Sequence, residues 1–163
     1  MQWTIGEAAI RKLLDDRELQ RVPLADHMAE SMLESARSHL ESVELIRDTD
    51  PDGAYTLCYD AARKASAALL QAQGLRATSA GGHIALREAV TAQFGQTREG
   101  ASLRRLDHMR RRRNVLEYSG QPSEAVTGAE LDEATAWTAE IIDFCERLVS
   151  KLDLFPQGAV HRK

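Results

Sequence analysis

The sequence contains few aromatic residues, and this scarcity argues against a protein built on β-sheets. Phe, Trp and Tyr make up only 5% of the 163 residues, although apolar residues as a whole make up 43%. Sheets favour β-branched and aromatic side chains, whereas alanine, which is abundant in this chain, suits closely packed helices. The apolar content is too high for a disordered chain, and the length is that of one domain with one core. We therefore expect a single all-α domain.

Cysteine is equally scarce, and its two positions exclude the common sites that depend on it. Cys58 and Cys145 form neither a CxxC pair nor another metal-binding spacing, and each falls on the apolar side of a predicted helix. Both are expected to be free, buried thiols. No stretch approaches the roughly 20 apolar residues of a membrane span, and the first residues do not read as a secretion signal. The expectation is a cytoplasmic protein with no membrane contact, no metal and no cofactor.

Lysine is also scarce, and the basic charge is concentrated in the arginines of one segment. The formal net charge is −4, yet six arginines and one acidic residue fall between Arg104 and Arg113. A planar guanidinium can grip phosphate or carboxylate with two hydrogen bonds, which a lysine ammonium cannot do. The arginine-rich segment (residues 110–118) is therefore a candidate binding surface. A general coding preference for arginine is the alternative explanation for the excess.

Six helical segments are predicted from apolar spacing and from residues that start or stop helices. They cover residues 5–19, 24–47, 51–74, 83–94, 101–118 and 127–152. Asp50 and Pro51 mark one helix start, and Thr127 with Glu130 forms a capping box at another. No alternating apolar and polar run is long enough for a strand. The regular apolar stripe of the last segment predicts tight antiparallel packing inside a bundle, or a dimer contact.

The domain organisation that follows is simple. Residues 1–22 are expected to form an N-terminal helical extension that begins with a capping pair, Thr4 and Glu7. Residues 23–155 are expected to form the helical bundle, and residues 156–163 a flexible tail.

The arginine-rich segment offers the densest group of candidate site residues. On a helix, Arg110, Asn114 and Glu117 lie near one face, and the three- and four-residue spacings bring Arg113, Glu117 and Tyr118 together. Such a surface suits a phosphate-bearing ligand, with cations for the phosphates and an amide or phenol for a sugar or base. The alternative is a solvated helix end. Consecutive like charges repel one another, so stability alone explains the pattern poorly.

Two further groups of residues are candidates for binding or chemistry. Asp60 precedes Lys64 by four residues, the favourable order for an ion pair on a helix. Asp60 and Arg63 also leave the apolar face, from where they could reach the arginine-rich segment; a surface lattice of ion pairs is the alternative. His83 follows two glycines at a helix start and is a candidate proton carrier near neutral pH. A capping or partly packed histidine is the alternative there.

Taken in order, these motifs resemble a HEPN domain (higher eukaryotes and prokaryotes nucleotide-binding). The order is Tyr59-Asp60-Ala61-Ala62-Arg63-Lys64-Ala65, then Gly74-Leu75-Arg76, then Gly81-Gly82-His83, then Arg112-Arg113-Asn114 followed by Glu117-Tyr118. The resemblance covers roughly residues 24–152 and is to an actinobacterial-type branch with an Arg-Asn-x-x-Glu-Tyr motif, in which an N-terminal extension also occurs. It implies an up-and-down bundle of four to five core helices, here with an added N-terminal helix, and usually a homodimer.

The resemblance also implies a class of function. Many members of the family are metal-independent endoribonucleases, often toxins paired with a nucleotidyltransferase-like antitoxin, and others bind nucleic acid or nucleotide without cleaving it. Position by position, Arg113 matches the motif arginine, Asn114 the polar residue after it, and Tyr118 the place of the motif histidine. Arg113 suits a charged phosphorane, whereas a tyrosine with a reference pKa near 10 is a poor base at neutral pH. Glu117 or His83 would then move protons.

The expected function is therefore binding of RNA or a nucleotide, with cleavage in a toxin–antitoxin or defence system as its catalytic form. The ligand-binding residues are expected to be Arg110, Arg112, Asp60, Arg63 and His83. The catalytic residues are expected to be Arg113, Asn114, Glu117 and Tyr118. The alternative is a non-catalytic interaction module whose arginines dock on an acidic partner, such as a nucleotidyltransferase-like protein.

Overall fold

The computed structural model describes residues 5–25, 27–118 and 125–157, and the fold is given for these ranges. They form α1 (Glu7–Asp15), β1 (Leu19–Arg21), α2 (Met28–Ile46), α3 (Pro51–Ala72), β2 (Leu75–Ala77), α4 (Gly82–Phe94), the 3-10 helix η1 (Ala101–Arg104), α5 (Arg105–Tyr118) and α6 (Gly128–Val149). The prediction of an all-α helical bundle is confirmed. None of these helices is both long and apolar enough to cross a membrane.

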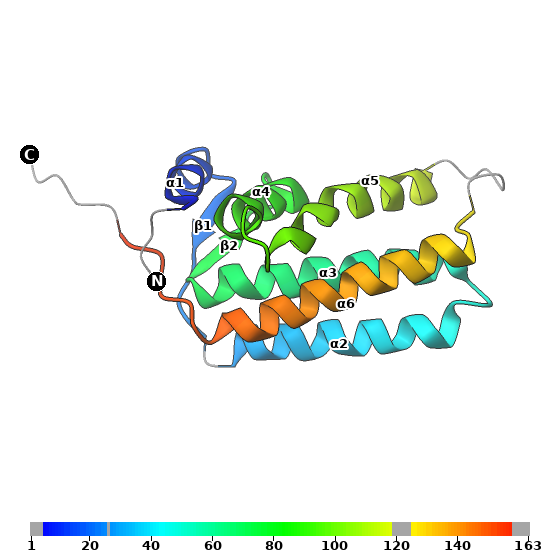
Figure 1. Cartoon of the computed structure of the whole chain (residues 1–163). Helices are drawn as coiled ribbons and strands as arrows, with labels where there is room; N and C mark the ends of the chain where they lie inside the picture. The colour runs from blue at the N-terminus through cyan, green and yellow to red at the C-terminus, as the bar shows by residue number, and fades with distance from the viewer. Residues whose placement is uncertain (1–4, 26, 119–124, 158–163) are drawn as a thin grey trace, which may run out of the picture.

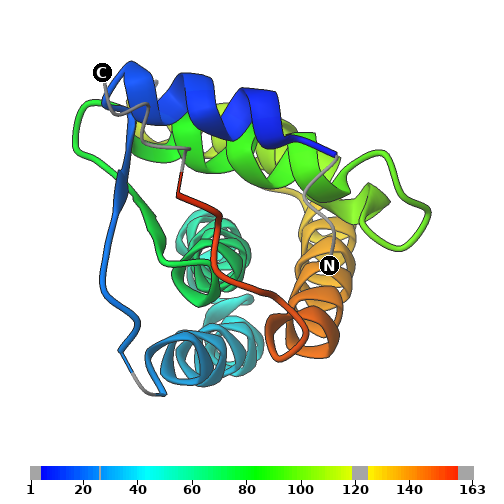
Figure 2. The same cartoon turned by 90° about the vertical axis from the view of Figure 1, so that its left-hand side faces the viewer.

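Four long helices, α2, α3, α5 and α6, lie side by side, and α4 and α1 cross over them at one end (Figures 1 and 2). Helix α3 is central and packs against α2, α4, α5 and α6. Its buried side includes four alanines, whose small side chains let the neighbouring helices approach closely: Ala61, Ala62, Ala65 and Ala68. The helices that contact α3 lie on two sides of it, with α2 and α6 on one side and α4 and α5 on the other.

The apolar stripe of α6 is buried inside the bundle, but its direction differs in part from the prediction. Thr138 donates a hydrogen bond to the backbone carbonyl of Cys58 at 3.2 Å, so α6 packs closely on α3. Helix α6 runs antiparallel to α2 but parallel to α3, its main partner (Figure 1). The reason is that β2, α4, η1 and α5 return the chain to the end of the bundle where α3 begins.

Two of the predicted helix starts are confirmed by side-chain caps. The Asp50 carboxylate accepts a hydrogen bond from the Gly53 amide at 2.9 Å, and Pro51 is the first residue of α3. The Thr127 hydroxyl accepts one from the Glu130 amide at 3.2 Å. For α1, the capping position is Gly6, and the predicted cap Thr4 lies outside the described residues.

The prediction that the chain has no strand is wrong at two three-residue segments. β1 and β2 pair antiparallel, with Leu19 opposite Ala77 and Arg21 opposite Leu75. Three residues are too few to show an alternating pattern, which is why the sequence does not reveal them. The pairing joins the N-terminal segment to the connection between α3 and α4.

Both ends of the described chain pack on the same core. Ile10 and Leu13 of α1 are buried, and α1 contacts α4. Phe155 is buried near the other end, and its amide donates to the Gln73 carbonyl at 3.0 Å. The Arg21 guanidinium lies 5.3 Å from the centre of the Phe155 ring. Most of the predicted flexible tail, residues 158–163, lies outside the described residues.

Candidate functional site

A hydrogen bond between Tyr59 of α3 and His83 of α4 marks the place where three helices meet. The Tyr59 hydroxyl and His83 Nδ1 are 3.0 Å apart. Tyr59 is only 3% exposed, and its burial raises the pKa of the phenol to about 12. Partial burial, and then the charge of Arg63, lower the pKa of His83. Both groups are therefore neutral at pH 7.

The turn before His83 depends on its two glycines. A side chain at Gly81 would lie 2.3 Å from the Glu18 carbonyl oxygen, and Gly82 has a φ of 51°, in the region that favours glycine. The turn begins α4 with His83 beside Tyr59, and His83 remains exposed to solvent. The predicted helix-start histidine is thus partly packed against a tyrosine and still reachable.

Three arginines lie close enough to this pair for their charges to act on it, and we call the group the basic cluster: Tyr59, Arg63, His83, Arg110 and Arg113. Arg63 comes from α3, and the other two arginines come from α5. The charges of all three act on both rings, opposing the rise in the pKa of Tyr59 and adding to the fall in that of His83. The structure therefore brings together five residues that are spread over three helices.

Asp60 holds Arg63 in place, but it forms no ion pair with Lys64, its predicted partner on the helix. Arg63 donates from Nε and Nη2 to the same Asp60 oxygen, at 3.0 and 2.8 Å. Burial opposes ionisation of Asp60, but this hydrogen bond lowers its pKa. Lys64 turns instead to α2, where Nζ lies 2.9 Å from the Ser35 hydroxyl and 3.0 Å from His39 Nε2. Asp60 therefore orients an arginine of its own helix, and not one of α5.

Asp107 is the anchor for the other side of the cluster. Its carboxylate forms ion pairs with Arg110 at 3.1 Å, Arg111 at 2.8 Å and Arg87 at 3.3 Å. Burial opposes ionisation of this carboxyl, but the three arginines lower its pKa. The Nε atoms of Arg87 and Arg110 are buried and have no acceptor in the described part of the chain. One carboxylate thus serves three guanidinium groups.

Three of the four predicted catalytic residues at the end of α5 lie together, and Tyr118 is exposed at the end of the helix. Arg113 pairs with Glu117 one turn later, and Arg113 Nη1 lies 3.4 Å from the side-chain oxygen of Asn114. Tyr118 is the last residue of α5, and its side chain is 79% exposed. The Tyr118 side chain makes no hydrogen bond to a described residue, whereas Arg113 belongs to the cluster.

Arg112 faces a different helix from its neighbours. Its Nε and Nη2 donate to the two carboxylate oxygens of Glu130 on α6, at 2.5 and 3.1 Å. The side chain of Arg112 is 19% exposed, and the Arg112 hydrogen bond lowers the pKa of Glu130. Of the predicted ligand-binding residues, Arg112 thus joins α5 to the start of α6, while Arg63, Arg110 and His83 lie in the cluster.

An apolar groove adjoins the basic cluster. It has a volume of about 490 Å³ and shares Arg63 and His83 with the cluster. The rest of its lining comes from the start of α2, the second half of α3, β2 and the start of α4, and is mainly apolar. A charged site and an apolar recess therefore lie side by side.

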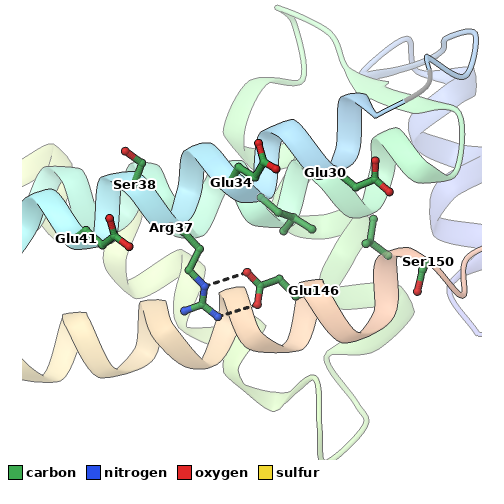
Figure 3. Close-up of a pocket in the computed structure, with 9 residues that line it drawn as sticks. Glu30, Glu34, Arg37, Ser38, Glu41, Glu146 and Ser150 are labelled. Carbon is green, nitrogen blue, oxygen red and sulfur yellow. Dashed lines mark hydrogen bonds and ion pairs between the residues drawn. The ribbon is translucent and has the colours of Figure 1, made fainter.

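A second hollow, the acidic groove, lies between α2 and α6 (Figure 3) and has a volume of about 510 Å³. Its lining includes one arginine and four glutamates: Arg37, Glu30, Glu34, Glu41 and Glu146. Arg37 reaches across it and donates to both Glu146 oxygens, at 2.9 and 2.7 Å. No three or more Asp, Glu, His and Cys side chains of the described ranges are grouped to hold a metal ion. The acidic groove is therefore a hollow between α2 and α6 that is bridged by ion pairs of Arg37.

Sequence reasoning missed three residues that build the site. Tyr59 falls on the apolar face of α3 and reads as a core residue, so the direction of its hydroxyl is not visible in the sequence. Arg87 and Asp107 lie on different helices, and no local pattern shows that they meet. Comparisons of this chain with protein-family models, with curated proteins and with solved structures find no match.

Proposed function

We propose that this chain is a HEPN-like domain that binds RNA or a nucleotide through phosphate contacts at the basic cluster. One observation carries the proposal: three arginines from two helices lie close enough to the neutral Tyr59–His83 pair for their charges to act on both rings. Guanidinium groups are the side chains best suited to phosphate oxygens, because they donate parallel hydrogen bonds. The resemblance of the motifs to HEPN domains supports the same ligand class.

The cluster arginines are oriented before any ligand arrives. Asp60 uses one oxygen to hold Arg63 through Nε and Nη2, so Arg63 Nη1 remains without a partner among the described residues. The side chains of the three cluster arginines are between 22% and 28% exposed, so they are partly desolvated and still accessible. Partial desolvation strengthens attraction to an anion, because the local dielectric constant is lower than that of water.

Cleavage of RNA is the second candidate function, and the position of His83 favours it. In the tautomer that donates Nδ1–H to the Tyr59 oxygen, Nε2 is free to act as a base. It would take the proton of a 2′-hydroxyl, whose oxygen would then bond to the neighbouring phosphorus while the bond to the 5′-oxygen breaks. That leaving oxygen would take a proton from solvent. The arginines would stabilise the charged phosphorane. His83 would take the role of the motif histidine, whose place in the sequence Tyr118 occupies.

Binding can be tested with labelled single-stranded RNA and fluorescence anisotropy. Arg63→Gln, Arg110→Gln and Arg113→Gln should each weaken binding about tenfold, the scale of one lost charged hydrogen bond. Arg147→Gln makes the same charge change on an exposed position of α6 and should leave affinity within about twofold. Unchanged affinity in all three cluster variants would refute the proposal. Binding of an acidic nucleotidyltransferase-like partner through the same arginines, without RNA binding, would establish the interaction module instead.

Cleavage can be tested separately, with EDTA present to remove metal ions. The wild type should shorten an RNA substrate, and His83→Ala should lose this activity while retaining RNA binding. Tyr118→Phe should keep it, because Tyr118 lies at the exposed end of α5. Loss of cleavage in Tyr118→Phe and retention in His83→Ala would reverse the assignment of the two residues. Absence of cleavage by wild type, with binding intact, would restrict the function to binding.

A further inference from the structure

The apolar groove beside the basic cluster has the composition of a nucleobase site. Resting on the proposed function, we infer that it receives one unpaired base of the ligand whose phosphate contacts the cluster. The ligand is then a mononucleotide or a single strand of RNA, and not a duplex.

The walls of the apolar groove fit a flat, mainly apolar group. They include Met28, Met32, Ala67, Leu75 and Leu86. Methionine side chains are flexible and polarisable, and they make favourable contacts with aromatic rings. The volume of about 490 Å³ lies within the range of pockets that hold small ligands. Met28 is also 46% exposed, so an apolar surface faces solvent at the rim of the groove.

The charged groups lie where a phosphate attached to such a base would need them. Arg63 and His83 belong both to the groove and to the basic cluster, and Arg76 lines the groove as well. A ligand with a planar apolar part and an anionic part matches this arrangement, because each part meets its complement within one continuous surface. A purely apolar ligand would leave the arginines unused, and a bare phosphate would leave the groove unused.

One polar side chain is available to contact the edge of a base. Gln71 lines the groove, and its side-chain amide makes no hydrogen bond to any described residue. An amide offers both a donor and an acceptor, as the edge of a base requires. In a duplex that edge is already paired and the base faces are stacked, so entry would cost a few kcal/mol for unstacking. The groove therefore selects an unpaired base.

The test compares AMP with ribose 5-phosphate, two compounds that share the phosphate but differ in the base. Calorimetry should show AMP binding to wild type about tenfold more tightly, the scale of one base contact. Ala67→Leu fills the groove and should remove this difference without changing the affinity for ribose 5-phosphate. Ala136→Leu, an exposed alanine of α6, is the matched control and should retain the preference. Met28→Ser at the exposed rim should reduce the preference without a risk to folding.

A second comparison identifies the source of the base. An unstructured RNA strand should bind at least about tenfold more tightly than a hairpin duplex of equal length. A strand that also binds more tightly than AMP identifies RNA as the ligand, and equal affinity identifies the mononucleotide; both support a base site. Equal binding of AMP and ribose 5-phosphate to wild type, or a preference retained in Ala67→Leu, would overturn the inference and leave phosphate binding at the cluster intact. If neither compound nor RNA binds, the proposed function itself fails.

Discussion

The basic cluster and the acidic groove lie on different sides of α3 and carry charge imbalances of opposite sign. Around the cluster, five arginines share four carboxylates: Arg63, Arg87, Arg110, Arg111 and Arg113 with Asp60, Glu88, Asp107 and Glu117. In and beside the acidic groove there is one arginine, Arg37, which pairs with Asp143 and Glu146. Three more carboxylates line the groove: Glu30, Glu34 and Glu41. A net charge of −4 therefore conceals two separate regions.

The two regions differ in more than sign. The acidic groove lies between α2 and α6, and Arg37 already joins the two helices through Asp143 and Glu146. In the basic cluster, the arginines lie beside two neutral groups that can donate and accept protons, Tyr59 and His83. An excess of one charge indicates a binding site only when it adjoins groups that can recognise or transform a ligand. By that criterion the cluster is the better candidate for a binding site, and the acidic groove is a contact between helices.

The largest expected effect comes from removing the support that the two regions share. Leu69 of α3 is fully buried, and Leu69→Ala should lower the free energy of unfolding by about 2–5 kcal/mol. Leu45→Ala removes a side chain that is 83% exposed and should change it by less than about 0.5 kcal/mol. Urea unfolding measures both. Equal effects would show that α3 is not the centre of the core.

Coupling energies should distinguish the ion pairs of the two sides. The Arg112 and Glu130 side chains are 19% and 27% exposed, against 36% and 38% for Arg37 and Glu146. Double-mutant cycles with glutamine should give about 1–2 kcal/mol for the first pair, as for hydrogen bonds between charged groups, and about 0.2–1 kcal/mol for the more exposed second pair. A stronger Arg37–Glu146 coupling would contradict the view that α5 is anchored more firmly than the acidic groove.

Acid should weaken the fold partly through the carboxylates that hold the cluster. The folded-state pKa values of Asp60 and Asp107 are lowered, so between the folded and unfolded values the unfolded chain binds more protons. Their stabilisation is fully present above the unfolded pKa of about 4 and is lost as the pH falls through the folded values. Thermal melting from pH 7 to pH 3 should therefore show a shallower acid loss for Asp107→Asn than for wild type. Parallel curves would exclude this role for Asp107.

The smallest effect is expected at one histidine. Partial burial and the charges of Arg63 and Arg113 lower the pKa of His83, so Arg63→Gln should raise it. Arg37→Gln in the acidic groove should leave it unchanged, because Arg37 is not among the charges that act on His83. A proton NMR titration of the imidazole resonances measures both variants. If the two variants give the same His83 pKa, the ring does not lie among the cluster arginines.

The helices follow from the sequence because their signals are local. The spacing of apolar residues and the caps at Asp50 and Thr127 act within a few residues of one another, and the structure confirms both caps. The β1–β2 pair depends on residues 19–21 meeting residues 75–77, a contact that no local pattern specifies. The direction of α6 relative to α3 depends in the same way on the path of all the elements between them.

The site is only partly visible in the sequence for a similar reason. A rotation of about 100° per residue shows that consecutive arginines leave α5 in different directions, but not which helix each one meets. The structure directs Arg112 to Glu130 on α6 and leaves Arg110 and Arg113 beside Tyr59 and His83. The arginine-rich segment is thus two surfaces, one structural and one a candidate for binding.

The most direct test observes the arginine side chains themselves while RNA is added. Their Nε–H resonances can be followed by NMR during titration with a single-stranded oligonucleotide, after assignment with the glutamine variants. Resonances of Arg63, Arg110 and Arg113 should shift with one common dissociation constant, and those of Arg37 and Arg47 should stay in place. The same shifts in Arg37 and Arg47, or none in the cluster arginines at saturating RNA, would contradict phosphate binding at the basic cluster.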